Sequence, residues 1–338
     1  MAKIHDLLKL LKKAPGLILI QPHDVPDPDA IASAFALGKL LSEYGIKTKL
    51  VYGREFHKID AKRMVEMLKI ELYKASELAE IDENSWIIIV DGQKGNANLG
   101  LLSGKNVAAI DHHELRKDAN YLFSDIRPET GSCSAIVAEY YKESKIKPDR
   151  LVATALSYGI LIDTDALTRG VSELDVAMLH WLHPYNDTDL LRKLRRRQLT
   201  LHDLGLLADG FKSVEILSKL AIMRLDGADD SLIGSANDII LSLDEADASV
   251  AYSVQQDGIR LSVRSTINPD SIYSDQAKTS NWPPRADELI KAVIKGLGFG
   301  GGHSYMAGGF IPLSALPKND EPGLLIKNRI RDYLEKFG

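Results

Sequence analysis

The stretch LILIQPHDVPDPDA, residues 17–30, joins a short apolar run to a polar turn and then to the start of a helix. The apolar run has the length of a buried strand. Pro28 suits the first turn of a helix, where the missing N–H of proline costs nothing. Strands and helices that alternate in this order build the sheets of α/β proteins. The stretch therefore predicts the first strand and the first crossover helix of an α/β domain.

The same alternation continues along the first half of the chain. Further apolar runs are TKLVY (48–52), WIIIVD (86–91) and VAAID (107–111). Helical spacing of apolar residues is found at about 29–44, in 61–73, and at 132–144, 149–162 and 173–182. This rhythm predicts a doubly wound, mostly parallel sheet. An amphipathic helix that docks on this domain is indicated before it by Ile4, Leu7, Leu8 and Leu11.

The amino-acid composition changes after HPYNDTD (183–189). The segment LLRKLRRRQLTLHDLGLLADG (190–210) is interpreted as one charged helix that links two domains. Asp257-Gly258 is a hairpin signal, and the β-like segments beyond the link are LAIMRL (220–225), ASVAYSVQQ (248–256) and IRLSVRST (259–266). A helix at 286–296 and a glycine-rich segment follow. We predict a first domain in 1–186, a helical linker in 187–212 and a smaller α/β substrate-binding domain in 213–338.

Charge and composition exclude several classes of protein. Lys and Arg total 42 against 47 Asp and Glu, a net charge of −5, which argues against a protein that coats nucleic acid. The basic run at 192–197 is interpreted as a solvated helix face or part of the linker, with a nucleic-acid track as the alternative. The single cysteine, Cys133, excludes an intrachain disulfide framework and favours a cytoplasmic location. No apolar run approaches the ~20 residues of a membrane span, so no membrane contact is expected.

Carboxylates and histidines follow the predicted strands. In chain order they are His23, Asp27 and Asp29 after LILIQ, Asp91 after WIIIV, Asp111, His112 and His113 after VAAI, and Asp163 at the end of the helix ALSYGILI. The carboxyl ends of parallel strands meet at one edge of a sheet, where ligands of this architecture bind. Taken singly, each aspartate is more often a helix cap or a turn residue. Four such endings at one edge are harder to explain in that way.

Carboxylates packed together repel one another unless cations neutralise them, so this cluster predicts bound metal. Aspartate oxygens and imidazole nitrogens without a thiolate suit Mn²⁺, Mg²⁺, Co²⁺ or Zn²⁺ rather than a structural zinc site. The number of ligands indicates two divalent ions. Two ions ~3.5–4 Å apart can activate a water and hold the oxygens of an in-line phosphoryl displacement.

Five separated motifs resemble those of the DHH phosphoesterase superfamily. They are His23-x3-Asp27-x-Asp29, Asp91, Asp111-His112-His113, GILIDTDALTR (159–169), and GFGGGHSYMAGG (298–309) preceded by SVRS (262–265). The last resembles the Gly-Gly-Gly-His motif of the DHH-associated substrate domain, so the resemblance extends from about residue 17 to 312. Pro28 and Asp165 stand where many members have glycine. Neither replaces a ligand, although Asp165 adds a negative charge near the site.

The resemblance implies a role for each candidate residue. Six metal ligands are divided between two ions: His23 and Asp27 for one, Asp29, His112 and Asp163 for the other, and Asp91 as the bridge between them. Asp111 would orient the histidines and His113 would contact the scissile phosphate, so both count as catalytic. Substrate would be bound in the second domain by Arg264, Gly300, Gly301, Gly302 and His303.

Within the superfamily, the length of the chain and its C-terminal motif resemble the stand-alone nanoRNases and pAp phosphatases. That resemblance implies a metal-dependent phosphoesterase that hydrolyses short oligoribonucleotides or dinucleotides such as pApA to mononucleotides. Removal of the 3′ phosphate of 3′-phosphoadenosine 5′-phosphate (pAp) is a further expected activity. The alternatives are a soluble cyclic di-AMP phosphodiesterase and a non-catalytic nucleotide-binding regulator on the same fold. The expected partner is a short oligoribonucleotide or nucleotide rather than a long duplex, and a homodimer is left open.

Overall fold

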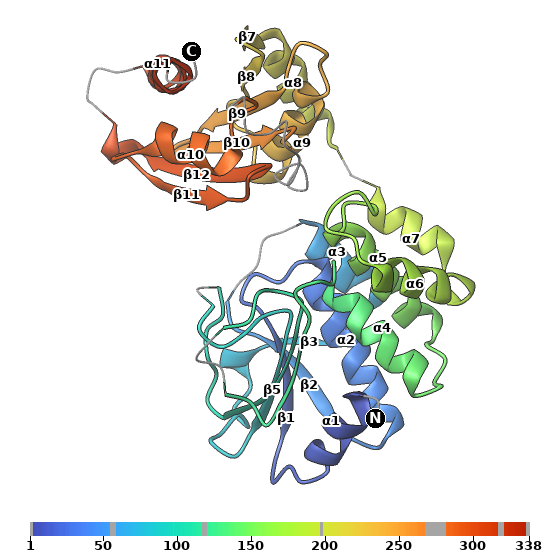
Figure 1. The fold of residues 1–338 in the computed structure, drawn as a ribbon. Coiled ribbons are helices and arrows are strands. Elements are labelled where there is room, and N and C mark those ends of the chain that lie inside the picture. The colour runs from blue at the N-terminus through green and yellow to red at the C-terminus, as the bar shows by residue number, and fades with distance from the viewer. Residues whose placement is uncertain are drawn as a thin grey trace. The chain divides into compact units, whose positions relative to one another are not determined.

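The computed structural model describes residues 3–54, 59–96, 98–116, 120–196, 199–267, 282–316 and 321–335. The chain divides into two compact units, Met1–Arg197 and Gln198–Gly338. Each unit contains a six-stranded sheet with helices packed against it (Figure 1). Among the described residues, no helix has both the length and the apolar character that a membrane span requires.

The sheet of the first unit is parallel throughout. Its strands are β1 (Ile18–Pro22), β2 (Thr48–Tyr52), β3 (Leu72–Lys74), β4 (Trp86–Val90), β5 (Lys105–Asp111) and β6 (Phe123–Ile126). They lie in the order β3-β2-β1-β4-β5-β6, and each neighbouring pair is parallel. The chain therefore winds outward from β1 in both directions, and the predicted doubly wound, mostly parallel sheet is confirmed.

The helices of the first unit gather on one side of its sheet (Figure 1). They are α1 (Lys3–Leu11), α2 (Pro28–Glu43), α3 (Ile59–Leu68), α4 (Cys133–Glu143), α5 (Arg150–Asp163), α6 (Glu173–Leu182) and α7 (Thr188–Arg195), with short 3₁₀ turns at Ala75–Glu77 and His183–Tyr185. One continuous core contains buried residues from all seven α-helices and from alternate strand positions such as Ile20, Ile88 and Ile110. The intervening strand residues Leu19, Ile87 and Ile89 face the other side, where connecting loops cover them with Leu78, Leu99, Leu102 and Tyr121.

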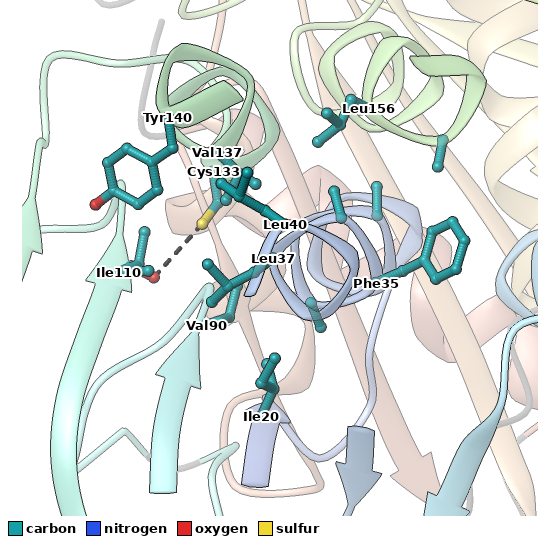
Figure 2. Close-up of a cluster of buried hydrophobic side chains, with 14 of the residues drawn as sticks. Ile20, Phe35, Leu37, Leu40, Val90, Ile110, Cys133, Val137, Tyr140 and Leu156 are labelled. Atoms are coloured by element: carbon teal, nitrogen blue, oxygen red, sulfur yellow. Dashed lines mark hydrogen bonds between the residues drawn. The ribbon is translucent and has the colours of Figure 1, made fainter. Parts of the chain in front are cut away.

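Figure 2 shows the centre of this core, where α2 and α4 pack on the strands. Leu37 and Leu40 of α2 meet Val90 of β4 and Val137 of α4. Cys133, the first residue of α4, is fully buried and its thiol donates a 3.4 Å hydrogen bond to the carbonyl of Ile110. Burial raises the pKa of this thiol well above its usual range. Cys133 is therefore a small buried residue at a helix start, as its sequence context predicts.

Two short edge strands, β3 and β6, were not predicted from the apolar runs of the sequence. The helix predicted in 61–73 ends at Leu68, because Lys69 adopts a left-handed backbone conformation with φ of 52°. The amide of Ile70 then donates to the carbonyl of Val65, which closes the helix end. The residues after this turn form β3. They are exposed or only partly buried, so β3 lacks the run of apolar residues that marks a buried strand.

The segment predicted as one charged helix is two helices, α7 and α8 (Leu201–Lys212). Thr200 starts the second helix, because its hydroxyl accepts from the amide of Asp203 while the Asp203 carboxylate accepts from the amide of Thr200. The division between the two units falls in this segment, at Arg197 and Gln198. In the basic run, Leu194 is buried and the described cations form the last turn of α7; residue 197 lies outside the described residues.

The second unit has a mixed sheet with helices on both faces. Its strands are β7 (Glu215–Leu217), β8 (Leu220–Arg224), β9 (Ala248–Val254), β10 (Gly258–Ser265), β11 (Phe299–Gly302) and β12 (Met306–Pro312), in the order β11-β12-β10-β9-β8-β7. Only β8 and β9 are parallel among the described pairs. One core holds α10 (Ala286–Ile294) and α11 (Pro322–Leu334), and another holds residues of α8 and α9 (Asp230–Leu241). A 3₁₀ turn, Leu313–Ala315, follows β12.

The glycine-rich segment near the C-terminus forms part of the sheet of the second unit. It forms β11 and β12, which pair with each other. A side chain on Gly300 would overlap the carbonyl of Gly308 on the neighbouring strand, and one on Gly309 would lie 2.8 Å from Ile290 of α10. These glycines are needed because β11, β12 and α10 approach one another closely. Packing therefore explains much of this composition without any ligand.

Candidate metal centre

The predicted ligands gather where the sheet order of the first unit reverses. His23 follows β1 and Asp91 follows β4, the two neighbouring strands from which the chain winds outward. Open α/β sheets bind ligands at this position, beyond the carboxyl ends of the strands. A pocket of about 310 Å³ lies here, lined by His23, Val25, Asp27, Asp91, Asn98, His112, His113 and Asp163.

Asp91 stands between two groups of ligand atoms. Its backbone adopts a left-handed conformation with φ of 56°, which turns the chain sharply as β4 ends. One carboxylate oxygen, Oδ2, lies 3.7 Å from His23 Nε2, and the other, Oδ1, lies 3.3 Å from His112 Nε2. The two oxygens therefore face different imidazoles, an orientation that suits a bridging ligand.

The first group consists of His23, Asp27 and Asp91, each of which offers one ligand atom within 4.8 Å of the others. Asp27 is the N-cap of α2, where its Oδ1 accepts from the amide of Ala30 at 3.1 Å. Its Oδ2 lies 3.8 Å from His23 Nε2. The cap therefore fixes one oxygen of Asp27 and leaves the other directed at the pocket.

The second group consists of Asp29, His112 and Asp163. Asp29 lies in the first turn of α2 and is buried; its two oxygens accept from the amides of Cys133 and Ser134 at 2.8 and 2.9 Å. These amides belong to the N-terminus of α4, where the helix dipole favours negative charge. His112 Nδ1 lies 3.2 Å from the carbonyl of Thr130, and His112 Nε2 lies 3.2 Å from Asp163 Oδ2. With its proton on Nδ1, His112 presents the Nε2 lone pair to the pocket.

The electrostatics of the second group call for added positive charge. Burial raises the pKa of Asp29 well above its usual range, and the charges of Asp91 and Asp163 act in the same direction. Burial also raises the pKa of Asp163, to about 6, although His112 opposes the shift. Burial acts to lower the pKa of His112, but contact with Asp91 and the neighbouring carboxylates outweigh it and raise that pKa to about 11. A protonated imidazole here takes the position that a metal cation would fill.

The residues present fit divalent metal ions. Every donor in the two groups is a carboxylate oxygen or an imidazole nitrogen, the mixture favoured by Mn²⁺, Mg²⁺, Co²⁺ and Zn²⁺. The buried Asp91 Oδ1 accepts no hydrogen bond of good geometry from the described residues, although the imidazole nitrogens His112 Nε2 and His113 Nδ1 lie 3.3 and 3.7 Å from it. A buried carboxylate oxygen without a donor is costly unless a cation binds it.

Asp111 and His113 form a pair beside these two groups, and His113 Nδ1 also lies 3.7 Å from Asp91 Oδ1, in a third set of possible ligand atoms that includes His112. Asp111 is fully buried, and its Oδ1 accepts from His113 Nδ1 at 2.8 Å. Burial opposes ionisation of Asp111, but the bonds from His113 and Gln93 outweigh it and lower its pKa. The bond from Asp111 raises the pKa of His113, whose half-exposed ring borders the pocket. His113 is thus held by a different residue from the one that holds His112.

Sequence reasoning missed the residues that support this pair. Gln93 is fully buried; its amide donates to Asp111 Oδ2 at 2.7 Å and to the carbonyl of Glu114 at 3.1 Å. Its carbonyl oxygen accepts from the amide of Arg116 at 2.9 Å. Gln93 therefore fastens the loop after the Asp111-His112-His113 motif to the sheet edge. A glutamine three residues beyond a strand carries no sequence signal for such a role.

The predicted substrate residues lie in the second unit, and the structure describes their surroundings there. Arg264 is largely buried, with Nε donating to Asp238 at 2.7 Å and Nη1 donating to Ser262 at 2.9 Å. The exposed ring of His303 stacks on Tyr305, 5.7 Å between centroids. Side chains on Gly300 and Gly302 would overlap β12, whereas one on Gly301 would meet no atom within 4 Å. Of the three glycines, Gly301 alone has no packing explanation among the described residues.

Two residues near the fourth motif lie outside the metal groups. Asp165 is exposed and adopts a left-handed conformation with φ of 46°, which explains why a glycine suits this position. Its side chain does not line the pocket. Arg169 donates from Nη2 to the carbonyl of Asp163 at 2.9 Å, so it supports the end of α5.

Comparison with known proteins agrees with this geometry. The DHH family, N-terminal domain, matches residues 17–160, the segment that contains all the candidate ligands except Asp163. Residues 17–160 are therefore similar to the N-terminal domain of the DHH family. An uncharacterized protein from Methanocaldococcus jannaschii is 29% identical over 304 residues, covering 89% of this chain and 59% of that protein. The cyclic-di-AMP phosphodiesterase GdpP of Geobacillus thermodenitrificans is 25% identical over 361 residues, covering 98% of this chain and 49% of that protein.

The chain thus spans between 49% and 59% of the length of these two curated relatives. A solved structure of an exopolyphosphatase-related protein from Bacteroides fragilis covers 99% of this chain and 97% of its own, with a TM-score of 0.72 at 17% identity. At that identity the likeness shows the fold alone.

Proposed function

We propose that this DHH-family chain is a metal-dependent phosphoesterase that hydrolyses short oligoribonucleotides or dinucleotides such as pApA, and that it also dephosphorylates pAp. The observation that supports the proposal is the position of Asp91, whose two oxygens face His23 on one side and His112 on the other. That arrangement suits two cations that share one carboxylate. Mn²⁺ is our first choice because the donors mix carboxylate and imidazole.

Each residue of the centre then has a chemical task. His23, Asp27 and Asp91 would hold one divalent ion, and Asp29, Asp91, His112 and Asp163 would hold the other. When bound, such ions polarise a phosphoryl oxygen and lower the pKa of a water. His113 would donate a hydrogen bond from Nε2 to the phosphate, because its Nδ1 is already bound to Asp111. Asp111 would orient this imidazole, and its hydrogen bond raises the pKa of His113, which favours a cationic group beside the charge that develops on the phosphate.

Substrate size is the second part of the proposal. A net charge of −5 disfavours a long polyanion and suits a ligand of a few nucleotides held by a small number of groups. In the second unit, His303 and the backbone of Gly301 are exposed, and Arg264 has donors beyond those used by Asp238 and Ser262. We assign phosphate binding to these groups.

A second candidate activity is hydrolysis of cyclic di-AMP. It is favoured by the likeness to a cyclic-di-AMP phosphodiesterase, which extends over 98% of this chain. The same metal groups would serve both reactions, because each breaks a phosphodiester bond.

The proposal is tested with purified protein, Mn²⁺ and a substrate panel of pApA, pAp, cyclic di-AMP, RNA of two to seven nucleotides, and pyrophosphate. Asp91→Ala should abolish hydrolysis, because it removes the carboxylate shared by the two groups. Asp209→Ala, an exposed carboxylate of α8, is the matched control and should retain full activity. Turnover of Asp91→Ala at the wild-type rate would refute the two-metal proposal. Binding of nucleotides without any turnover would favour a non-catalytic regulator instead.

A further inference from the structure

Asp175 is a fully buried carboxylate of α6 that belongs to neither metal group. Its Oδ2 accepts from the amide of Gly131 at 2.8 Å and from the amide and hydroxyl of Ser172 at 2.9 and 2.6 Å. Its Oδ1 accepts from the hydroxyl of Ser132 at 2.7 Å. The contacts with Ser172 form a capping box at the start of α6. The hydrogen bonds from Gly131 and Ser132 are not part of this capping box, so capping of α6 does not explain why Asp175 accepts them.

The segment that Asp175 holds, residues 130–134, contacts two ligands of the second metal group. The carbonyl of Thr130 accepts from His112 Nδ1, which sets the direction of the imidazole. The amides of Cys133 and Ser134 donate to the two oxygens of Asp29. Residues 130–134 therefore orient both His112 and Asp29, although the segment itself supplies no ligand.

Close packing shows how tightly Asp175 is joined to this segment. A side chain on Gly131 would lie 2.7 Å from Asp175 Oδ2 and 2.6 Å from the carbonyl of Gly170. Ser132, the N-cap of α4, accepts from the amide of Ala135 while it donates to Asp175. The start of α4 is thus attached to α6 through one buried carboxylate. Loss of that carboxylate would leave a buried amide and a buried hydroxyl without their acceptor, which the segment could relieve only by moving.

We propose that Asp175 is a positioning residue for the metal group of Asp29, His112 and Asp163. It acts through residues 130–134, which carry its effect to Asp29 and His112 together. Through these contacts Asp175 reaches Asp29 and His112, so its effect is expected at the ion that these two residues would hold. The inference rests on the proposed metal binding, and it adds a residue on which the affinity of one ion depends. Residues that orient metal ligands in this way commonly change metal affinity by about 10- to 100-fold when removed.

The test measures binding of Mn²⁺ alone to the full chain, by calorimetry and by electron paramagnetic resonance of free Mn²⁺. Asp175→Ala should weaken one bound equivalent of Mn²⁺ by about 10- to 100-fold and leave the other unchanged. Ser172→Ala is the matched control, because it removes the other half of the capping box while Asp175 keeps Gly131 and Ser132. It should bind Mn²⁺ like the wild type.

Asp175→Asn keeps an oxygen for the two amides but turns a donor toward Ser132, so its affinity should lie between those of the wild type and Asp175→Ala. If circular dichroism shows that Asp175→Ala is unfolded, the Mn²⁺ affinity of Asp175→Asn tests whether Asp175 is a positioning residue. Wild-type affinity in the folded Asp175 variants would overturn the inference, as would an equal loss in Ser172→Ala. Failure of the wild-type chain to bind Mn²⁺ would instead overturn the proposed function, together with this inference.

Discussion

His112 and His113 are neighbours in the chain, yet their imidazoles have different partners. His112 is directed by the carbonyl of Thr130 and presents Nε2 to Asp91 and Asp163. His113 is bound through Nδ1 to Asp111, and half of its side chain is exposed at the pocket. The two rings are tilted by 59° to each other. Neighbouring residues of one motif therefore present one imidazole to Asp91 and Asp163 and bind the other to Asp111.

We expect alanine substitutions of His112 and His113 to have different effects, one on metal content and the other on kcat. His112→Ala should lower the Mn²⁺ content of the purified protein, because a ligand of the second group is lost. His113→Ala should keep its Mn²⁺ and lose about 10²- to 10³-fold in kcat, because its interaction is with charge that develops in the transition state. Elemental analysis and steady-state kinetics on pApA measure the two effects. Equal metal loss in both variants would contradict this division.

Asp163 should make the metal-free protein sensitive to pH. Its pKa is raised in the folded chain to about 6 from a usual 3.8, mainly by burial. The folded state therefore holds the proton of Asp163 more tightly than the unfolded state does. The protonated carboxyl group contributes fully to the free energy of unfolding below pH ~4, and this contribution is lost as pH rises through 6. Asp163→Asn, which stays neutral, should therefore gain in Tm over the wild type as pH increases from 4 to 7.

The measurement is thermal unfolding in EDTA at both pH values. Asp165→Asn, an exposed carboxylate two residues along the chain, is the control and should show no such gain. Added Mn²⁺ should raise the Tm of the wild type more than that of Asp163→Asn, because the ion stabilises the state that binds it. A difference in Tm that does not vary with pH would show that the Asp163 carboxylate is not destabilising when charged.

At the scale of elements, the close crossing of α2 and α5 places Asp29. Gly159 of α5 makes the crossing possible: a side chain there would overlap the Ser134 hydroxyl and lie 2.9 Å from Asp29 Oδ1. The Cβ of Ala32 would be only 3.1 Å away. The helix that ends on one ligand, Asp163, thus packs directly against another ligand through a glycine.

Gly159→Ala should destabilise the chain by about 1–3 kcal/mol, the usual effect of overpacking a core. Because Asp29 must move to make room, the same variant should bind Mn²⁺ more weakly. Gly205→Ala in the exposed helix α8 is the matched control, since a side chain there meets no atom within 4 Å. It should stabilise the protein by about 0.5–1 kcal/mol, the difference in helix propensity between alanine and glycine. Urea unfolding measures the change in the free energy of unfolding for both variants. A Gly159→Ala variant as stable as the wild type would contradict the packing argument.

At the scale of the whole molecule, each unit has its own core and its own chemistry. The first unit contains both metal groups, and the second contains the residues assigned to phosphate binding. A metal centre acts on the phosphate that it binds, but it does not by itself measure the length of a substrate. We expect the second unit to supply that preference.

His303→Ala should raise the KM for pApA by about tenfold, the effect of losing one hydrogen bond to a charged group. Hydrolysis of bis-p-nitrophenyl phosphate should change little, because this small activated ester needs no second phosphate site. His202→Ala, an exposed histidine of α8 in the same unit, is the control. A parallel loss of kcat/KM on both substrates would place His303 in the chemistry or in the fold, and length selection would be rejected.

The sequence by itself determined the four central strands of the first unit and the identity of the residues that meet at their carboxyl ends. Buried parallel strands must be continuously apolar, so runs such as 17–21 and 86–90 are recognisable without knowledge of their partners. The order of strands and helices then places the ends of β1, β4 and β5 together. His23, Asp91 and His112 could be grouped from this order alone, because each directly follows a strand.

Some local signals were present in the sequence and were outweighed by longer patterns. Thr200 and Asp203 have the spacing of a capping box, yet the charged periodicity of 190–210 suggested a single helix. The glycines of 298–309 were candidates for substrate binding through their resemblance to a known motif, and the structure shows that they form two paired strands. Glycine is compatible with both structures, so composition could not distinguish a ligand-binding loop from a crowded strand pair.

Only the tertiary structure decided how the ligands are held in place. Gln93 reaches Asp111 across 18 residues of chain, and Asp175 reaches Ser132 across 43. Such hydrogen bonds depend on which helix packs beside which strand, and neither residue has a periodicity or spacing that marks it. The ligand types follow from the chemistry of metals, which acts on residue identity. Their orientation follows from buried polar contacts between distant segments, which exist only after the chain has packed.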